Sequence, residues 1–133
     1  FLPVDKPAYD GVSAEVMAVL RSFPLDVEVL GWDEAFLGNG LLGDTGDPRV
    51  VADDVRAAVL QRTRLHCSVG IGDNKLQAKI ATSFGKPRGV GLLTSADWDT
   101  VMGQRPVTAL WGIGTKTARR LEQLGIRTVG ELG

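Results

Sequence analysis

The stretch LDVEVLGWDEAFLG, residues 25–38, decides how the first part of the fold is read. Apolar and polar residues alternate on the way in, and AFLG resumes the apolar run after two adjacent carboxylates, Asp33 and Glu34. Alternation on both sides of a short polar break predicts a β-hairpin with the carboxylates at or near its turn. The pair is either a solvated turn between two strands or a site that holds a cation, and both interpretations stay open at this point.

The residues on either side of the acidic pair argue against its interpretation as a simple solvated turn. Turns are usually rich in Gly, Asn or Pro, whereas Trp32 precedes the pair and an apolar trio follows it. Successive side chains of a strand point to opposite faces, so both carboxylates can serve one site only at a strand end or a bend. If they do, a hard divalent cation such as Mg²⁺ is the natural ligand.

The composition limits the class of protein. The chain has 133 residues, of which 44% are hydrophobic, enough for one main domain with a small appendage. One cysteine, Cys67, and one histidine, His66, exclude an internal disulfide and a Cys/His zinc site, and we interpret both as structural residues. We find neither an apolar run near eighteen residues nor a leader, so we expect a soluble cytoplasmic protein with no membrane association.

Charge is distributed unevenly along the chain. Residues 1–60 hold eleven acids and four bases, whereas residues 61–133 hold five acids and eleven bases, although the net charge is only −1. The second half therefore favours an anionic partner. The chain begins without Met, and Thr128 and Glu131 near its end have capping-box spacing for a helix that is not present. We therefore expect these residues to be a piece of a longer protein.

The order of elements predicts an α+β fold. Helical periodicity after Asp10, a possible N-cap, predicts a helix that ends near Pro24, and residues 38–48 form a glycine-rich loop. Asp47 and Pro48 supply an N-cap and a first-turn proline for a helix over 48–63. Strands over 65–72 and 88–94 flank a helix over 74–84, and a short helix follows at about 97–102. This order predicts an antiparallel or mixed sheet with helices packed on it.

Details of the later helices follow from the same patterns. Helix 74–84 begins at Asp73 or Asn74 and is expected to turn Leu76, Ile80 and Phe84 inward. Asp97 and Thr94 frame the short helix that contains Trp98 and Met102. After Pro106 the chain changes to short helical units joined by glycine turns, so we place a domain boundary near residues 103–106. We interpret all three tryptophans as packing residues: Trp32, Trp98 and Trp111.

The stretch LWGIGTKTARRLEQLGI, residues 110–126, could bind phosphate. Gly112 and Gly114 precede a helix that starts at about Thr115, so the backbone there can approach another molecule and present free N–H groups to an anion. Lys116, Arg119 and Arg120 add positive charge that suits a DNA backbone. A plain glycine turn between packed helices fits equally well, but the fuller pattern is similar to the helix-hairpin-helix phosphate-binding motif.

A second glycine-containing connection lies at residues 68–91. Gly70 and Gly72 lead from a strand into the helix start, an arrangement that can bind phosphate but is more often an ordinary connection. Lys86 follows the end of that helix. It either complements the helix dipole or reaches an anion beside the sheet.

Three blocks taken together resemble a known family: WDEAFL (32–37), SVGIGDNKLQAKIATSFGKPRG (68–89) and PVTALWGIGTKTARRLEQLGI (106–126). In order and separation they are similar to the Y-family, or translesion, DNA polymerases, closest to the DNA polymerase IV branch. The resemblance implies a partial palm domain at residues 1–104, with its N-terminal strand and the fingers missing. A partial, all-helical thumb domain with a helix-hairpin-helix then occupies residues 105–133.

The resemblance also implies roles for individual residues. Asp33 and Glu34 match the adjacent carboxylates that bind two Mg²⁺ ions, Asp33 as the shared ligand and Glu34 at the primer end, with a third carboxylate expected upstream of Phe1. Lys86 matches the lysine that contacts the incoming nucleoside triphosphate. The turn matches the thumb hairpin that grips duplex phosphates through Gly112, Gly114, Lys116 and Thr117. The family usually has Ser and a small aliphatic residue where this chain has Gly31 and Trp32, and often Asp at Gly38.

The function implied is low-fidelity, template-directed DNA synthesis past damaged bases, within DNA repair and replication. Primer-template DNA and deoxynucleoside triphosphates are the expected partners, with a sliding clamp as a further partner of a segment outside these residues. The chain alone is expected to be inactive and, because its sheet edge is uncovered, to self-associate. The alternatives are a non-catalytic DNA-binding adaptor with a polymerase-like frame and a small metal-dependent helix-hairpin-helix nuclease.

Overall fold

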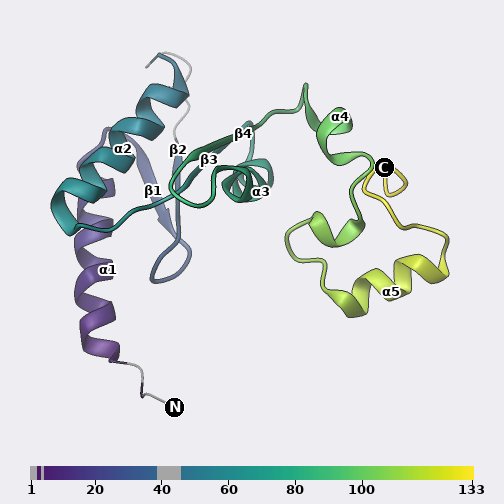
Figure 1. The fold of residues 1–133 in the computed structure, drawn as a ribbon, viewed down its shortest axis with the longest axis horizontal. Helices are drawn as coiled ribbons and strands as arrows, with labels where there is room; N and C mark the ends of the chain where they lie inside the picture. Colours follow the sequence, from purple (N-terminus) through teal and green to yellow (C-terminus); the bar gives the residue numbers. More distant parts are fainter. Residues whose placement is uncertain (1–2, 4, 39–45) are drawn as a thin grey trace. The chain divides into compact units, whose positions relative to one another are not determined.

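The computed structural model describes residues 3, 5–38 and 46–133 (Figure 1). Most of the predicted glycine-rich loop, residues 39–45, lies outside this described part. The chain divides into two compact units, Phe1–Cys67 and Ser68–Gly133, and each is described by itself below. No helix in the described part is both long and apolar enough to cross a membrane.

The first unit packs two helices over a β-hairpin. It contains α1 (Lys6–Arg21), β1 (Asp26–Val29), β2 (Ala35–Gly38) and α2 (Pro48–Thr63). The strands pair antiparallel with Val29 opposite Ala35, so the hairpin predicted from the alternation is confirmed. Its core joins the two helices, with the hairpin residues Val27 and Leu37 packed against it; the buried members are Met17, Val19, Leu20, Val55 and Val59.

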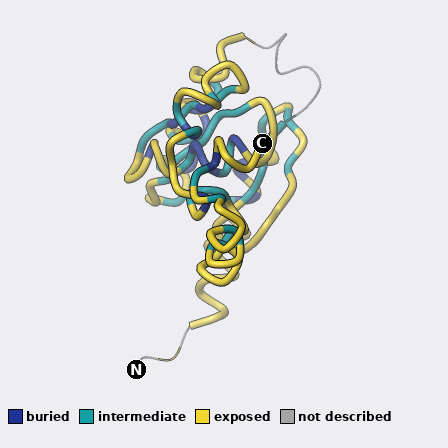
Figure 2. Tube along the Cα trace, turned by 90° about the vertical axis from the view of Figure 1, so that its right-hand side faces the viewer, coloured by how far each residue is buried: buried dark blue, intermediate teal, exposed yellow. Residues whose placement is uncertain are grey.

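Helix α1 begins earlier than predicted. Asp5, and not Asp10, is the N-cap, because its carboxylate accepts the Ala8 N–H at 3.2 Å. Pro7 fits the first turn, where a missing N–H costs nothing, so the helix extends upstream of the periodic residues. Figure 2 shows that the N-terminal half of α1 is exposed, whereas its C-terminal half carries the buried residues.

Helix α2 and the residues after it agree with the pattern. Asp47 is the N-cap, and its carboxylate accepts the Arg49 N–H at 2.9 Å, with Pro48 in the first turn. Cys67 packs partly buried against the core of this unit, in keeping with its predicted structural role. Burial raises the pKa of the Cys67 thiol, and the nearby charge of Arg56 lowers it by less.

The second unit packs a helix on a pair of parallel strands. It contains β3 (Val69–Gly72), α3 (Lys75–Gly85) and β4 (Val90–Leu93), followed by α4 (Trp98–Met102), the 3₁₀ helix η2 (Val107–Ala109) and α5 (Thr115–Gln123). Strands β3 and β4 align with Val69 opposite Val90. The described strands thus form one antiparallel and one parallel pair, each with helices packed on it, and the predicted α+β class is confirmed.

Glycines in the strands let α3 lie against its sheet. A Cβ atom at Gly70 would stand 2.0 Å from the Ala78 carbonyl oxygen, and one at Gly91 would stand 1.9 Å from the Ala81 carbonyl oxygen. Real side chains do not reach such distances, so only glycine permits this backbone approach. The close approach places the end of α3, and therefore Lys86, beside the start of β4.

This contact also corrects the predicted inner face of α3. Leu76 and Phe84 were expected to point inward, yet they are 38% and 36% exposed. Ile80 is buried as predicted, and the rest of the buried face holds Gln77, Ala81 and Gly85, of which Ala81 and Gly85 are small where the helix backbone approaches the strands. The ring of Phe84 is covered by the Arg105 guanidinium, 4.9 Å from its centroid.

The C-terminal segment shares its core with α3 and β4. Val129 is buried in one cluster with Leu93 and Met102, both 0% exposed. The N–H groups of Val129 and Gly130 donate to the carbonyl groups of Arg105 and Gly103, both at 2.9 Å. Residues on the two sides of the predicted palm–thumb boundary at 104/105 thus belong to one packed unit, and that functional boundary stays a prediction.

The predicted helix signals near Thr94 and Thr128 have structural counterparts. The Thr94 hydroxyl donates to the Asp97 carboxylate at 2.7 Å at the start of α4. The Glu131 carboxylate accepts the N–H groups of Arg127 and Thr128 at 2.8 and 3.0 Å, as the glutamate of a capping box does. These backbone donors lower the pKa of Glu131.

Candidate functional site

The two carboxylates lie in the turn of the first hairpin. Asp33 and Glu34 fall between β1 and β2, and both are exposed. The N–H groups of Leu30 and Gly31 both donate to the Glu34 carbonyl oxygen, at 2.9 and 3.2 Å, and so close the turn. Because the pair lies between the paired strands, the alternation of a strand does not assign its side chains to opposite faces.

The chemistry of this turn fits a hard cation. Carboxylate oxygens are the ligands that Mg²⁺ prefers, and both side chains are open to solvent. Within the described residues, no three His, Cys, Asp or Glu side chains gather in a group that could hold a metal ion. Among the described residues the turn thus offers two carboxylates, and their role as metal ligands stays a prediction.

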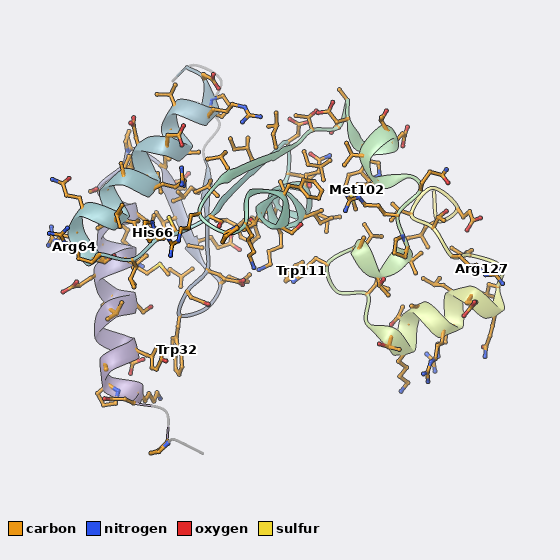
Figure 3. The ribbon with its side chains drawn as sticks, in the orientation of Figure 1. Trp32, Arg64, His66, Met102, Trp111 and Arg127 are labelled. Carbon is orange, nitrogen blue, oxygen red and sulfur yellow. The ribbon has the colours of Figure 1, made fainter. Side chains whose placement is uncertain are left out.

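An aromatic stack beside the turn was not anticipated. The Trp32 ring stacks on Tyr9 of α1 with 6.3 Å between centroids and 14° between planes, although Trp32 is 50% exposed. The Ser13 hydroxyl donates to the Trp32 carbonyl oxygen. Figure 3 shows the Trp32 side chain beside the N-terminal half of α1. The four-residue spacing of Tyr9 and Ser13 was the available signal, because it places both on one face of a helix.

Lys86 caps the C-terminal end of α3 and is exposed. The preceding residue, Gly85, packs so closely that a Cβ there would lie 2.7 Å from the Gly91 nitrogen. On the other side, the Arg88 N–H donates to the Ser68 hydroxyl at 3.1 Å. The backbone of Lys86 thus follows a helix end that packs closely against β4, and contact of its side chain with an anion stays a prediction.

The start of α3 is an ordinary connection. Asn74 is the N-cap and accepts the Gln77 N–H at 2.9 Å, while the Gln77 side chain accepts the Asp73 N–H at 2.9 Å. The Asp73 carboxylate accepts the Ser95 N–H at 2.7 Å, which lowers the pKa of Asp73. Side chains of the protein therefore accept the N–H groups of Asp73 and Gln77 at this helix start, which favours the ordinary connection over a phosphate site.

The turn before α5 has the geometry that the phosphate-binding pattern requires. Gly112 has φ +92, a conformation that side chains rarely adopt, and Gly114 is the N-cap. A glycine has no side chain that could cap the helix, so the first N–H groups of α5 can face a ligand. Lys116 and Thr117 are exposed in the first turn of α5, and Arg119 and Arg120 are exposed in the next.

Trp111, which lies just before this glycine turn, contacts Lys79 of α3. It is 55% exposed, and the Lys79 ammonium lies 5.9 Å from the centre of its ring. Trp111 is therefore a surface residue and Trp98, partly buried against the second core, a packing residue. Figure 3 shows Trp111 on the loop that leads to α5.

An α+β frame with an acidic hairpin turn, followed by a glycine turn before a basic helix, defines the class: the chain is of the Y-family DNA polymerase type. The model of the impB/mucB/samB family matches residues 1–83, and that of the IMS family HHH motif matches residues 95–126. The chain belongs to the impB/mucB/samB family.

Curated relatives agree with this assignment. DNA polymerase IV 2 of Mycobacterium tuberculosis (strain ATCC 25618 / H37Rv) is 51% identical over 132 residues, which cover 99% of this chain and 38% of that protein. DNA polymerase IV of Methanoculleus marisnigri is 38% identical over 99% of this chain and 37% of its own length. The chain thus spans under two-fifths of these relatives.

Solved structures give the same fold. DinB from Sulfolobus solfataricus matches with a TM-score of 0.82 and 28% identity over 96% of this chain and 38% of that one. A Dbh ternary complex matches with a TM-score of 0.85 and 28% identity over 98% of this chain and 40% of its own. The resemblance to Y-family polymerases inferred from the three sequence blocks is confirmed.

Proposed function

We propose that the protein containing this chain is a template-directed DNA polymerase that extends primers past damaged template bases. The observation that carries the proposal is the acidic pair Asp33–Glu34 in an exposed hairpin turn, in a chain 51% identical to a DNA polymerase IV 2. Residues 1–104 then form most of a palm domain and residues 105–133 the start of a thumb. The substrates are primer-template DNA and deoxynucleoside triphosphates, and the site of action is the cytoplasm.

Asp33 and Glu34 would hold Mg²⁺ in this protein. Bound Mg²⁺ supplies charge neutralisation at the triphosphate and lowers the pKa of the attacking hydroxyl group. Asp33 would serve as a ligand shared by two ions, and Glu34 would hold the ion on the primer side. The turn holds both carboxylates at the surface, where DNA and nucleotide can reach them. Because two carboxylates are an incomplete ligand set, we expect residues 1–133 alone to bind Mg²⁺ weakly and to be inactive.

Lys86 contributes a positive charge to nucleotide binding. A lysine ammonium is a compact point charge that suits a phosphate, and the packed end of α3 limits where its backbone can lie. We assign it to the triphosphate of the incoming nucleotide. Its role is to orient the nucleotide by attraction, with no proton transfer.

The turn before α5 grips the DNA backbone. The glycine backbone at Gly112 and Gly114 lets a phosphate come close to the free N–H groups of α5, and Lys116 and Thr117 add a charge and a hydroxyl donor. Contacts to phosphate carry no sequence information, which suits an enzyme that must act on any template. A sliding clamp would bind elsewhere in the complete protein.

Primer extension by the complete reading frame tests the proposal. Asp33→Asn and Glu34→Gln should each lower the rate of primer extension by more than about 100-fold. Losing a group that only orients a metal ligand costs up to about 100-fold, and losing the ligand itself should cost more. Val50→Ala, which changes an exposed apolar residue of α2, is the control and should leave the rate unchanged. Full activity of both acidic variants would refute the proposal.

A Mg²⁺ titration with and without nucleotide separates the alternatives. A polymerase should bind Mg²⁺ more tightly when a deoxynucleoside triphosphate is present, because the phosphates complete the ligand set. A nuclease should bind the ion and cut DNA without nucleotide. A non-catalytic adaptor should bind DNA equally well with or without Mg²⁺ and nucleotide. Light scattering on residues 1–133 tests the expected self-association, and a strict monomer at high concentration would contradict it.

A further inference from the structure

One residue of the acidic turn is attached to helix α1 at two points. Trp32 immediately precedes Asp33; its ring stacks on Tyr9 and its carbonyl oxygen accepts the Ser13 hydroxyl (Figure 3). Tyr9 and Ser13 are four residues apart, so they project from the same face of α1. The helix therefore contacts both the side chain and the backbone of Trp32.

The backbone contact bears directly on Asp33. The carbonyl group of Trp32 belongs to the rigid peptide plane whose nitrogen is that of Asp33, so holding this oxygen limits the orientation of that plane and with it the φ angle of Asp33. Gly31, on the other side of Trp32, is exposed, and an added Cβ would have open space among the described atoms. No described atom packs where a Cβ of Gly31 would stand, whereas the hydrogen bonds to the Glu34 carbonyl oxygen and the contacts with α1 both hold the turn.

The stack is separate from the core of the first unit. Tyr9 and Trp32 are 58% and 50% exposed, whereas the core residues Met17, Val55 and Val59 are at most 4% exposed. Loss of the stack should therefore leave the packing of α1 on α2 intact. The stack adds little to the core, and it acts on Trp32, the residue before Asp33. Its main effect is therefore on the conformation of the turn.

We infer that Trp32 is a positioning residue: with Tyr9 and Ser13 it holds the Asp33–Glu34 turn in the conformation that binds a divalent cation. The inference rests on the proposed function of these carboxylates as Mg²⁺ ligands. A turn that is already ordered loses less conformational entropy when the ion binds, so the affinity for the ion is higher.

The experiment compares variants of the complete reading frame that remove or keep each contact. Trp32→Leu removes the stack and Trp32→Phe keeps an aromatic ring; Ser13→Ala removes the hydroxyl donor and Ser13→Thr keeps it. Hydrogen exchange at the Leu30 and Gly31 amides reports opening of the turn, because both bond to the Glu34 carbonyl oxygen. Electron paramagnetic resonance measures the dissociation constant for Mn²⁺, which carboxylates bind as they bind Mg²⁺.

The expected result is selective. Trp32→Leu and Ser13→Ala should speed exchange at Leu30 and Gly31 and raise the Mn²⁺ dissociation constant by about threefold to tenfold, the range for losing one aromatic stack. Trp32→Phe and Ser13→Thr should restore both values. Primer extension should need more Mg²⁺ for half-maximal rate while approaching the original rate at saturating Mg²⁺, a pattern that general destabilisation does not produce. The Val50→Ala control should move none of these readouts.

Two further outcomes distinguish a failure of this inference from a failure of the proposed metal site. Unchanged exchange and Mn²⁺ affinity in Trp32→Leu and Ser13→Ala, together with lost Mn²⁺ binding in Asp33→Asn, would overturn the positioning role and leave the metal site standing. Unchanged Mn²⁺ binding in Asp33→Asn would overturn the metal site itself, and with it the inference.

Discussion

Replacing Gly91 by Ala tests how closely α3 lies on its strands. The added Cβ would meet the Ala81 carbonyl oxygen at 1.9 Å, the Ala81 carbonyl carbon at 2.9 Å and the Gly85 nitrogen at 3.0 Å. All three atoms belong to the backbone of α3, so no side-chain rotation can relieve the contact. The helix must retreat by roughly 1.5 Å to restore ordinary van der Waals distances.

That retreat separates α3 from both strands. Overpacking a core with one methyl group costs about 1–3 kcal/mol when side chains can adjust, and more when backbone must move. We therefore expect Gly91→Ala to lower the free energy of unfolding by at least about 3 kcal/mol. Lys86 should move with the end of α3, so the KM for nucleotide should rise in the protein that remains folded.

Urea unfolding of the complete protein, followed by circular dichroism, measures the change. Gly11→Ala is the matched control, because Gly11 lies inside α1 and an added Cβ would meet open space among the described atoms. Alanine favours a helix interior over glycine by about 0.8–1 kcal/mol, so this variant should be more stable than the original. If Gly91→Ala unfolds within about 0.5 kcal/mol of the original protein, the usual range for surface changes, the close approach of α3 is refuted.

Three other results are expected. Gly112→Ala should weaken DNA binding more than Gly125→Ala in a salt-controlled binding assay, although both glycines have positive φ, because only Gly112 lies in the turn proposed to bind phosphate; equal losses would contradict that role. Asp73→Asn should reduce the loss of stability in acid unfolding below pH 3.8, since the Ser95 N–H holds the pKa of the Asp73 carboxyl below that ordinary value, and its stabilisation disappears on protonation. Met102→Ala, at a fully buried position, should cost about 2–5 kcal/mol in urea unfolding, and a smaller loss would show a core that repacks.

Local signals were sufficient wherever one or two neighbouring residues decide the backbone. Asp47 with Pro48 begins α2, as the sequence predicts, and Asn74, one of the two predicted starts, caps α3. Each depends on a side chain or a φ angle within a turn of the residue it affects. The hairpin that carries the acidic pair was predictable for the same reason, because its alternation and its polar break are contiguous.

Helix α3 shows where local reasoning failed. Its apolar periodicity correctly placed Ile80 inside but wrongly added Leu76 and Phe84, because the strand glycines bring the backbones together around Ala81 and Gly85 and turn those two residues outward. Periodicity counts hydrophobic residues and does not measure the distance between two backbones. The stack of Trp32 on Tyr9 escaped prediction in a similar way, because the two residues meet only once the hairpin folds beside α1.

The sequence by itself therefore determined the order of elements, the cap of α2 and the family, since these reside in contiguous residues and in motif spacing. It also determined that Asp33 and Glu34 are adjacent and that Gly112 and Gly114 precede a basic helix. Only the tertiary structure decided that Lys86 follows a helix pressed onto two strands and that α1 holds the residue before Asp33. Those facts depend on contacts between segments that are distant in sequence. Packing sets these contacts, and a local sequence pattern carries no information about it.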